Sequence, residues 1–214
     1  MSIKPQKLLL GDTIGIIAPA MALTPESFKQ ASDCLVLNGF KVKHSNNLFK
    51  TTYGYVATPE ERADDFNNMI LDDNIKMILF GGGEVSNEIL PYIDFETIKK
   101  HPKIICSYSD STTILNAVTS ISDVVTYYGQ SPKTFFNLNE YNYSSFKSSF
   151  LNNDIPTYIK SGNWKTIHDG ICKGKLIGGY LVNFAFMLNG KYINIDKDEK
   201  YILFIEDHEK FSSP

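Results

Sequence analysis

The sequence contains no block of Lys and Arg and no long apolar stretch. Its 21 basic and 24 acidic side chains are interspersed and give a formal net charge of −3. A protein that neutralises a run of phosphates needs clustered cations, so we expect no nucleic-acid partner. No apolar stretch approaches the roughly 18 residues of a membrane span, and the first residues lack the apolar region of a signal peptide. We therefore expect a cytoplasmic protein with no membrane partner.

Cysteine is also scarce. Cys34, Cys106 and Cys172 are odd in number, far apart and set among apolar neighbours. This pattern fits reduced core thiols better than a disulfide framework. No group of His, Cys, Asp and Glu has the spacing of a metal site. The sequence thus predicts neither a metal ion nor a cofactor.

Apolar, strand-like runs alternate with helix-like segments, which is typical of an α/β fold with a mostly parallel sheet and flanking helices. Helix-start signals occur at Thr24-Pro25-Glu26 and in the capping box from Thr58 to Glu61. We divide the chain into an α/β domain at residues 1–136, a linker with a surface helix at 137–154, and a largely β C-terminal domain at 155–214. We expect this second domain to be incomplete. The strand-like runs are 11–20, 40–44, 75–80, the run ending at Ser109, 124–128 and 201–207.

The stretch from Lys103 to Thr113 carries the clearest chemical signal. An apolar run stops at a Tyr-Ser-Asp corner, and a helix-like segment follows. A strand, a sharp turn and a helix would place Ser109 at the apex, which is how hydrolases present a nucleophilic serine. Spacing alone favours a plainer role, in which Ser109 or Ser111 caps the helix, because Ser is among the commonest N-caps.

Three glycines, Gly81-Gly82-Gly83, separate the strand-like run 75–80 from a short helical segment. They are compatible with a tight turn that binds nothing, with a phosphate cradle, or with an oxyanion hole that serves Ser109. The run lacks the Lys-Ser/Thr of a P-loop and the further glycine of a dinucleotide fingerprint, which weakens the phosphate interpretation. Because neighbouring parallel strands end on one sheet edge, we expect Gly83 near Ser109.

Glu206 ends the apolar run that begins at Tyr201. Acids at strand ends are usually just solvated, but a carboxylate that orients a catalytic histidine would be built in the same way. His208 shares a strand face with Glu206, and the two lie too close along one strand to form a relay aimed at Ser109. We interpret the remaining histidines, at positions 44, 101 and 168, as surface residues.

Together these features resemble the LD-carboxypeptidase family of serine peptidases, which includes the microcin C immunity peptidases. The similar motifs are collinear and cover nearly the whole chain. They are Gly11-Asp-Thr-Ile-Gly-Ile16, Glu60-Glu-Arg-Ala-Asp-Asp-Phe-Asn67, Gly82-Gly83 followed by Ser86–Asp94, Tyr108–Thr113, Tyr128-Gly129, Gly174–Gly179 and Leu203–Asp207.

The resemblance implies a serine carboxypeptidase that cleaves a cytoplasmic peptide with a free carboxyl end, either a murein tetrapeptide or a peptidyl-nucleotide antibiotic. It assigns the nucleophile to Ser109 and the histidine-orienting carboxylate to Glu206. It also implies that the backbone amides of Gly83 and Asp110 form the oxyanion hole. Gly82 and Tyr108 are assigned to substrate binding.

The chain departs from the family pattern in three ways. Ser107 replaces the glycine usual two residues before the nucleophile, and Tyr180 replaces the asparagine usual after the second Gly-Gly pair. Family members also continue well beyond the Glu-Asp strand, and their catalytic histidine lies in that part. We therefore expect a truncated form with slow turnover, whose uncovered apolar surface favours a homodimer or other self-association. The alternatives are an inactive relative that binds peptides and, more remotely, a nucleotide-binding module.

Overall fold

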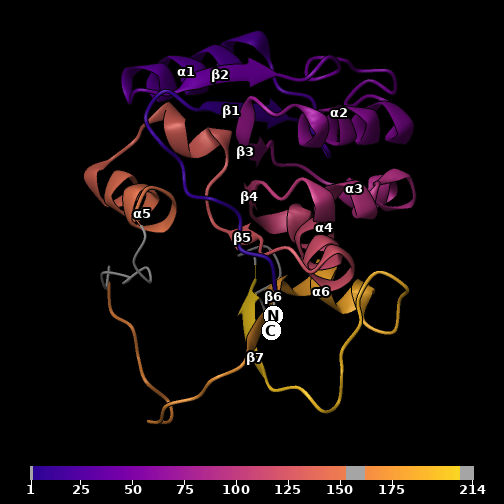
Figure 1. The fold of residues 1–214 in the computed structure, drawn as a ribbon, viewed down its shortest axis with the longest axis vertical. Coiled ribbons are helices and arrows are strands. Elements are labelled where there is room, and N and C mark those ends of the chain that lie inside the picture. The colour runs from indigo at the N-terminus through magenta and orange to yellow at the C-terminus, as the bar shows by residue number, and fades with distance from the viewer. Residues whose placement is uncertain (1, 153–161, 208–214) are drawn as a thin grey trace.

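The computed structural model describes residues 2–152 and 162–207. Its centre is a five-stranded sheet in the order β2-β1-β3-β4-β5, and every pair of neighbouring strands is parallel. Figure 1 shows this sheet with helices on both faces, which confirms the predicted α/β class. The strands are β1 Thr13–Ile17, β2 Lys41–His44, β3 Ile75–Phe80, β4 Ile104–Ser107 and β5 Tyr127–Tyr128.

Side chains of the central strands are buried on both faces, which is why these strands are continuously apolar. Met77 and Leu79 of β3 join the core cluster beneath one helical layer, and Ile78 and Phe80 join the cluster on the other face. The first layer contains α1 Pro25–Leu37, the 3₁₀ helix η4 Pro132–Phe136 and α5 Glu140–Phe150. The second contains α2 Pro59–Leu71, the 3₁₀ helix η1 Ser86–Tyr92, α3 Phe95–Lys100, α4 Thr112–Ala117 and the π-helical turn η3 Val118–Ser122.

Both predicted helix starts are present. The Thr24 hydroxyl accepts a hydrogen bond from the Ser27 amide at 3.1 Å, and α1 begins at Pro25. Thr58 and Glu61 form the reciprocal capping box at the start of α2. Local side-chain chemistry thus determines where these two helices begin.

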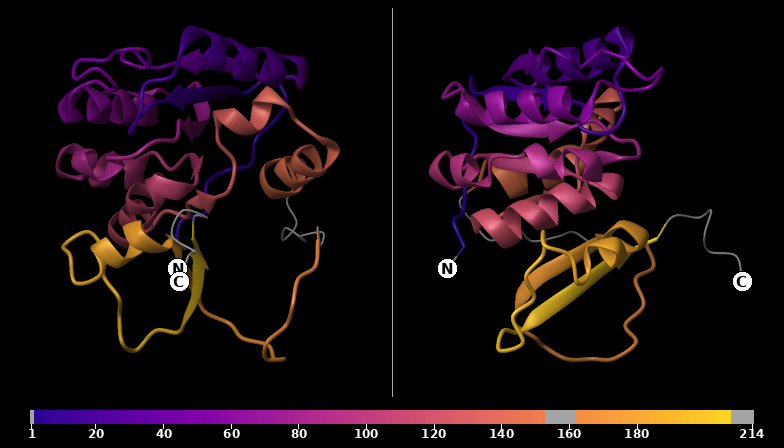
Figure 2. Two further views of the ribbon diagram at one scale, coloured as in Figure 1. Left: turned by 180° about the vertical axis from the view of Figure 1, so that it is seen from behind. Right: turned by 90° about the vertical axis from the view of Figure 1, so that its right-hand side faces the viewer.

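A smaller group lies beyond α4 and β5, as Figures 1 and 2 show. It consists of β6 Lys175–Tyr180, α6 Leu181–Met187 and β7 Tyr201–Glu206. The two strands are parallel, and Tyr180 pairs with Glu206 at their carboxyl ends. Phe184 and Met187 of α6 are buried. The group therefore rests its helix against the larger domain.

The structure differs from the sequence expectations at several places. The predicted strand 124–128 shortens to Tyr127–Tyr128, because Val124 pairs instead with Ile3 in an isolated bridge. The helix within the expected linker, α5, buries Phe146 and Phe150 in the core of the larger domain. The expectation of three core thiols was wrong, since Cys106 is buried but Cys34 is half-buried and Cys172 exposed.

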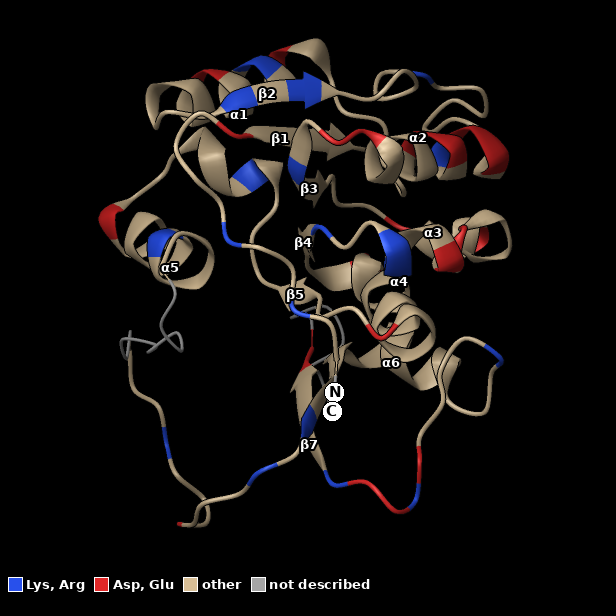
Figure 3. Cartoon of the chain, viewed as in Figure 1, with Lys and Arg blue, Asp and Glu red and all other residues tan. Residues whose placement is uncertain are grey.

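Charges of both signs are spread over the elements of the described chain, as Figure 3 shows. The longest helices there, α1 and α2, have 13 residues each, and neither these nor any other described helix could cross a bilayer.

Candidate active site

Ser109 is separated from the end of β4 by one residue and lies at the start of the short 3₁₀ turn η2 Ser109–Ser111 that leads into α4. Its φ of +59° is in the left-handed region, which is uncommon for a residue with a side chain and marks a strained turn. The Ser109 carbonyl accepts a hydrogen bond from the Thr112 hydroxyl at 2.6 Å, and its N–H donates to the Tyr128 hydroxyl at 2.8 Å. The turn is thus held from two sides while the Ser109 side chain stays partly exposed.

Tyr128 ends β5, the strand next to β4, and connects Ser109 to the second domain. Its hydroxyl accepts from the Ser109 N–H and donates to the Glu206 carboxylate at the end of β7. Burial and the bond to Glu206 raise the pKa of Tyr128, so the phenol keeps its proton as a donor to this carboxylate. Sequence reasoning gave Tyr128 no role. The available signal was that β5 also ends on the Ser109 edge of the sheet.

Asp110 joins the serine turn to two other elements. One oxygen of its buried carboxylate accepts from the Ser86 N–H at 2.7 Å, and the other accepts from the Asn183 side-chain amide at 2.7 Å. The Ser86 hydroxyl donates to the Asp110 carbonyl at 2.8 Å. The residue after Ser109 is therefore fixed both to η1 and to α6.

The glycine turn follows β3 and lies beside the serine turn, because β3 pairs with β4 and the Ser107 hydroxyl contacts the Phe80 carbonyl at 3.4 Å. Gly83 has φ +141°, and a Cβ added there would lie 2.6 Å from the Met21 Cβ. The exposed Gly82 has nothing within 4 Å of such a Cβ. Glycine is thus required at position 83 and not at position 82, and the oxyanion role of Gly83 stays a prediction.

Tyr108, assigned to substrate binding by resemblance, is half-buried just before Ser109. It has extended backbone angles, φ −150° and ψ −176°, and its carbonyl accepts from the Ser111 N–H at 3.4 Å. Its substrate role also stays a prediction.

Among the described histidines, His44 and His101 contact residues outside the serine turn. His44 is exposed and packs its ring against Phe28 and Phe49. The His101 Nδ1 atom lies 3.8 Å from the Asp73 Oδ1 atom. His168 is exposed. His208 lies outside the described residues.

Two other kinds of site are disfavoured by the described part of the chain. Burial raises the pKa of the Cys106 thiol to about 12, so this cysteine, three residues from Ser109, is no nucleophile at neutral pH. The described residues contain no group of three His, Cys, Asp or Glu side chains that could hold a metal ion.

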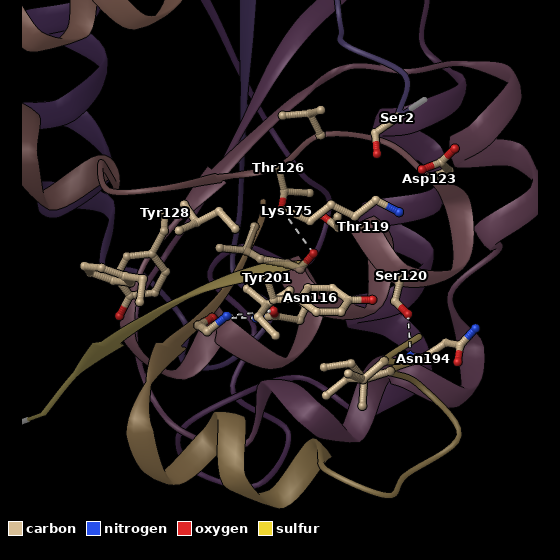
Figure 4. Close-up of a pocket in the computed structure, with 18 residues that line it drawn as sticks. Ser2, Asn116, Thr119, Ser120, Asp123, Thr126, Tyr128, Lys175, Asn194 and Tyr201 are labelled. Carbon is tan, nitrogen blue, oxygen red and sulfur yellow. Dashed lines mark hydrogen bonds between the residues drawn. The ribbon is translucent and has the colours of Figure 1, made fainter. Parts of the chain in front are cut away.

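A cavity of about 420 Å³ lies between α4, β5 and the β6–β7 pair, with Tyr128 at one edge and Lys175 extending into it, as Figure 4 shows. Several of its polar groups are paired within the protein. The Ser120 hydroxyl accepts from the Asn194 N–H at 2.7 Å, and the Asn116 amide donates to the Gly178 carbonyl at 2.7 Å. The cavity therefore lies where the β6–β7 pair faces α4 and β5, with part of its polar lining already paired.

Comparison with known proteins shows which family the chain resembles. The sequence profile of the LD-carboxypeptidase N-terminal domain matches residues 14–129. A probable murein peptide carboxypeptidase of Bacillus subtilis is 34% identical over 97% of this chain and 66% of its own length. The microcin C7 self-immunity protein MccF of Escherichia coli is 35% identical over 57% of this chain and 37% of its own.

Solved structures are similar over most of the chain. An MccF-like protein from Bacillus anthracis has a TM-score of 0.85 at 27% identity and covers 96% of this chain and 70% of its own. MccF in complex with glutamyl sulfamoyl guanosine has a TM-score of 0.80 at 26% identity, with 95% and 70% covered. The chain thus spans about two thirds of the length of these relatives.

Proposed function

The chain belongs to the LD-carboxypeptidase family, and on that premise we propose that it is a serine-type carboxypeptidase with Ser109 as its nucleophile. The observation that carries this proposal is the strained turn of Ser109, φ +59°, at the carboxyl end of β4. A strained strand-to-helix turn of this kind exposes a hydroxyl to an incoming carbonyl. The Ser109 turn is held by the Tyr128 hydroxyl, which also contacts the Glu206 carboxylate.

In the proposed reaction, the Ser109 oxygen attacks the carbonyl carbon of the terminal amide bond of the peptide. The carbonyl oxygen becomes an oxyanion, which the backbone N–H groups of Gly83 and Asp110 stabilise. The C–N bond then breaks as the general base returns the serine proton to the leaving nitrogen, and the terminal amino acid departs. Water hydrolyses the acyl-enzyme, which frees the shortened peptide acid and restores the Ser109 hydroxyl. Tyr108 precedes the serine turn and Gly82 lies in the glycine turn, and the peptide would bind against these two turns.

A general base must take the proton of Ser109, and Glu206 is the carboxylate that would orient a histidine. His44 and His101 contact other parts of the described structure, and His168 is exposed. We propose that the base comes from outside the described residues, through a segment equivalent to the remaining third of the relatives or through a second copy of the chain.

Two substrate classes follow from the relatives. One relative is named as a murein peptide carboxypeptidase, and another is a microcin self-immunity protein whose structure contains glutamyl sulfamoyl guanosine. The first name points to an amide bond next to a free carboxyl group, whereas the second ligand carries a glutamyl group on a sulfamoyl nucleoside. We propose a small peptide with a free carboxyl end, or a peptidyl nucleotide, as the substrate.

The test is release of the terminal D-amino acid from an LD-tetrapeptide. The 214-residue chain and a fusion carrying the remaining third of the Bacillus subtilis relative are assayed side by side. We expect Ser109-dependent release by the fusion, and loss of at least about 10³-fold in the Ser109→Ala fusion. Release that survives Ser109→Ala, or a folded fusion that releases nothing, would overturn the proposal.

A further inference from the structure

Arg62 is a buried cation that the proposed chemistry does not use. Its side chain is 1% exposed. The guanidinium donates to the carbonyls of Ala57 at 3.0 Å, Pro19 at 2.6 Å and Val85 at 3.2 Å, and it contacts the Glu88 carboxylate. Burying a charge is costly unless it is paired and hydrogen-bonded. A buried arginine whose planar guanidinium bonds several groups therefore holds those groups in fixed positions.

The partners of Arg62 lie where ligands bind in open α/β sheets. Pro19 follows β1 and Val85 follows β3, and these strands are neighbours in the order β2-β1-β3. The chain winds in opposite directions on either side of β1, so the carboxyl ends of β1 and β3 form the crevice at the topological switch point. One side chain from α2 thus ties together the two loops that border this crevice.

The contact with Val85 reaches the serine turn through a single peptide unit. The carbonyl of the Val85–Ser86 peptide accepts from Arg62, and its N–H donates to the Asp110 carboxylate at 2.7 Å. Val85 has φ +73°, a left-handed conformation that is a genuine outlier for a β-branched residue. A strained backbone of this kind persists only where its surroundings hold it.

We infer that Arg62 is a positioning residue that holds the Gly81–Val85 turn at a fixed distance from Ser109. This inference rests on the proposed function, because the turn contains Gly83. Arg62 holds the carbonyl side of the Val85–Ser86 peptide and Asp110 holds its amide side. The glycine turn is therefore attached to the residue that follows the nucleophile. Loss of the guanidinium frees the strained Val85 and lets the amide of Gly83 move relative to the Ser109 hydroxyl.

Lys103 provides a matched control. It is also buried, and its ammonium likewise donates to two carbonyls, those of Asp72 at 2.7 Å and Ile75 at 2.8 Å. These carbonyls lie at the amino end of β3, the sheet edge opposite the serine turn. Lys103→Met therefore removes a buried cation without touching the crevice, whereas Arg62→Met and Arg62→Lys act on the crevice loops.

The first readout is hydrogen exchange at the Ser86 amide, measured by NMR on the 214-residue chain. We expect Arg62→Met to speed this exchange at least about tenfold beyond its effect on global unfolding, and Lys103→Met to change it only as far as global stability changes. Arg62→Lys keeps the charge without the planar fork, so it should fold and show an intermediate effect. Equal Ser86 exchange in wild type and Arg62→Lys, or equal effects of the Arg62 and Lys103 variants, would overturn the inference.

The second readout is the rate at which a fluorophosphonate probe modifies Ser109, because this reaction also develops charge on an oxygen in the oxyanion site. Under conditions in which both variants are fully folded, Arg62→Met should slow labelling at least about tenfold. Lys103→Met should not slow it. A fusion with the remaining third of the Bacillus subtilis relative whose Ser109 is never labelled would count against the proposed function, while the Ser86 exchange would still decide the role of Arg62.

Discussion

At the scale of single residues, the site depends on a few contacts that hold strained backbone. Ser109 has φ +59°, and its N–H is bound by the Tyr128 hydroxyl. The same hydroxyl donates to Glu206, 78 residues further along the chain. One side chain therefore sets both the conformation of the proposed nucleophile and the position of the acid.

Tyr128→Phe should remove the link between the Ser109 N–H and the Glu206 carboxylate. The variant leaves the Ser109 N–H without its partner, and an unsatisfied, largely buried donor costs about 1–3 kcal/mol. Tyr201→Phe is the control, because its hydroxyl also accepts a backbone N–H, that of Asp196 at 2.9 Å, but at an exposed position. Urea unfolding should show the larger loss for Tyr128→Phe. Equal losses would mean that the Tyr128 bridge is not formed.

The two neighbouring glycines make a second residue-scale test. Gly83→Ala places a Cβ 2.6 Å from the Met21 Cβ at φ +141°, so we expect a loss of about 1–3 kcal/mol. Gly82→Ala adds a methyl group in open space and should change stability by less than about 0.5 kcal/mol. Thermal unfolding of both variants measures the difference. A Gly83→Ala protein as stable as Gly82→Ala would show that the turn does not pack against Met21.

At the scale of elements, local signals in the sequence were enough to predict some parts and not others. The capping box of α2 and the whole of β3 could be predicted, because their determinants lie within a few residues. The segment after Gly83 forms the 3₁₀ helix η1 with Pro91 inside it, where an ordinary short helix was expected.

The parts of the site that sequence could not predict depend on distant partners. Tyr128 meets Glu206, and Asn183 meets Asp110, only after the two domains pack together. β5 is short because Val124 pairs with Ile3, which lies near the N-terminus. No local pattern carries such pairings, although the parallel pairing of β3 and β4 could be predicted, and with it the position of the glycine turn and the serine turn on one sheet edge.

The junction of α2 and β3 gives an element-scale prediction on pH. Hydrogen bonds from Lys43 and from the Asn74 amide lower the pKa of Asp72 from 3.8 to about 2. The folded state therefore favours the ionised carboxylate. This contribution to stability is complete above about pH 4 and is lost as pH falls toward 2.

Asp72→Asn should consequently be less stable than wild type at pH 6 and should lose less stability between pH 4 and pH 2. Asp64→Asn removes one carboxylate at an exposed position on α2 and is the control. Urea unfolding at a series of pH values measures both. Parallel stability curves for wild type and Asp72→Asn would show that Asp72 is not held as an anion.

At the scale of the whole molecule, the chain spans about two thirds of the length of its relatives, and its smaller domain carries exposed apolar side chains. On one face of β7, Leu203 is 59% exposed and Ile205 is 39% exposed. Contiguous exposed apolar surface of this kind favours association. The 214-residue chain should therefore self-associate through the β6–β7 pair.

Sedimentation velocity measures this association. Leu203→Lys should shift the chain toward monomer, because it places a charge in the apolar face. Leu37→Lys at the end of α1 changes a leucine that is 87% exposed on the far part of the larger domain and should leave the association unchanged. A wild-type chain that stays monomeric at concentrations of tens of micromolar, roughly the range of weak dimers, would contradict the prediction.

The most direct test of the whole account is to locate the residue that a serine-directed fluorophosphonate modifies, by fragment mass spectrometry of the labelled protein. Ser109 as the nucleophile predicts a covalent adduct on Ser109 in the fusion with the remaining third of a relative, and none on the Ser109→Ala form of that fusion. An adduct on another residue, or equal labelling after Ser109→Ala, would contradict it.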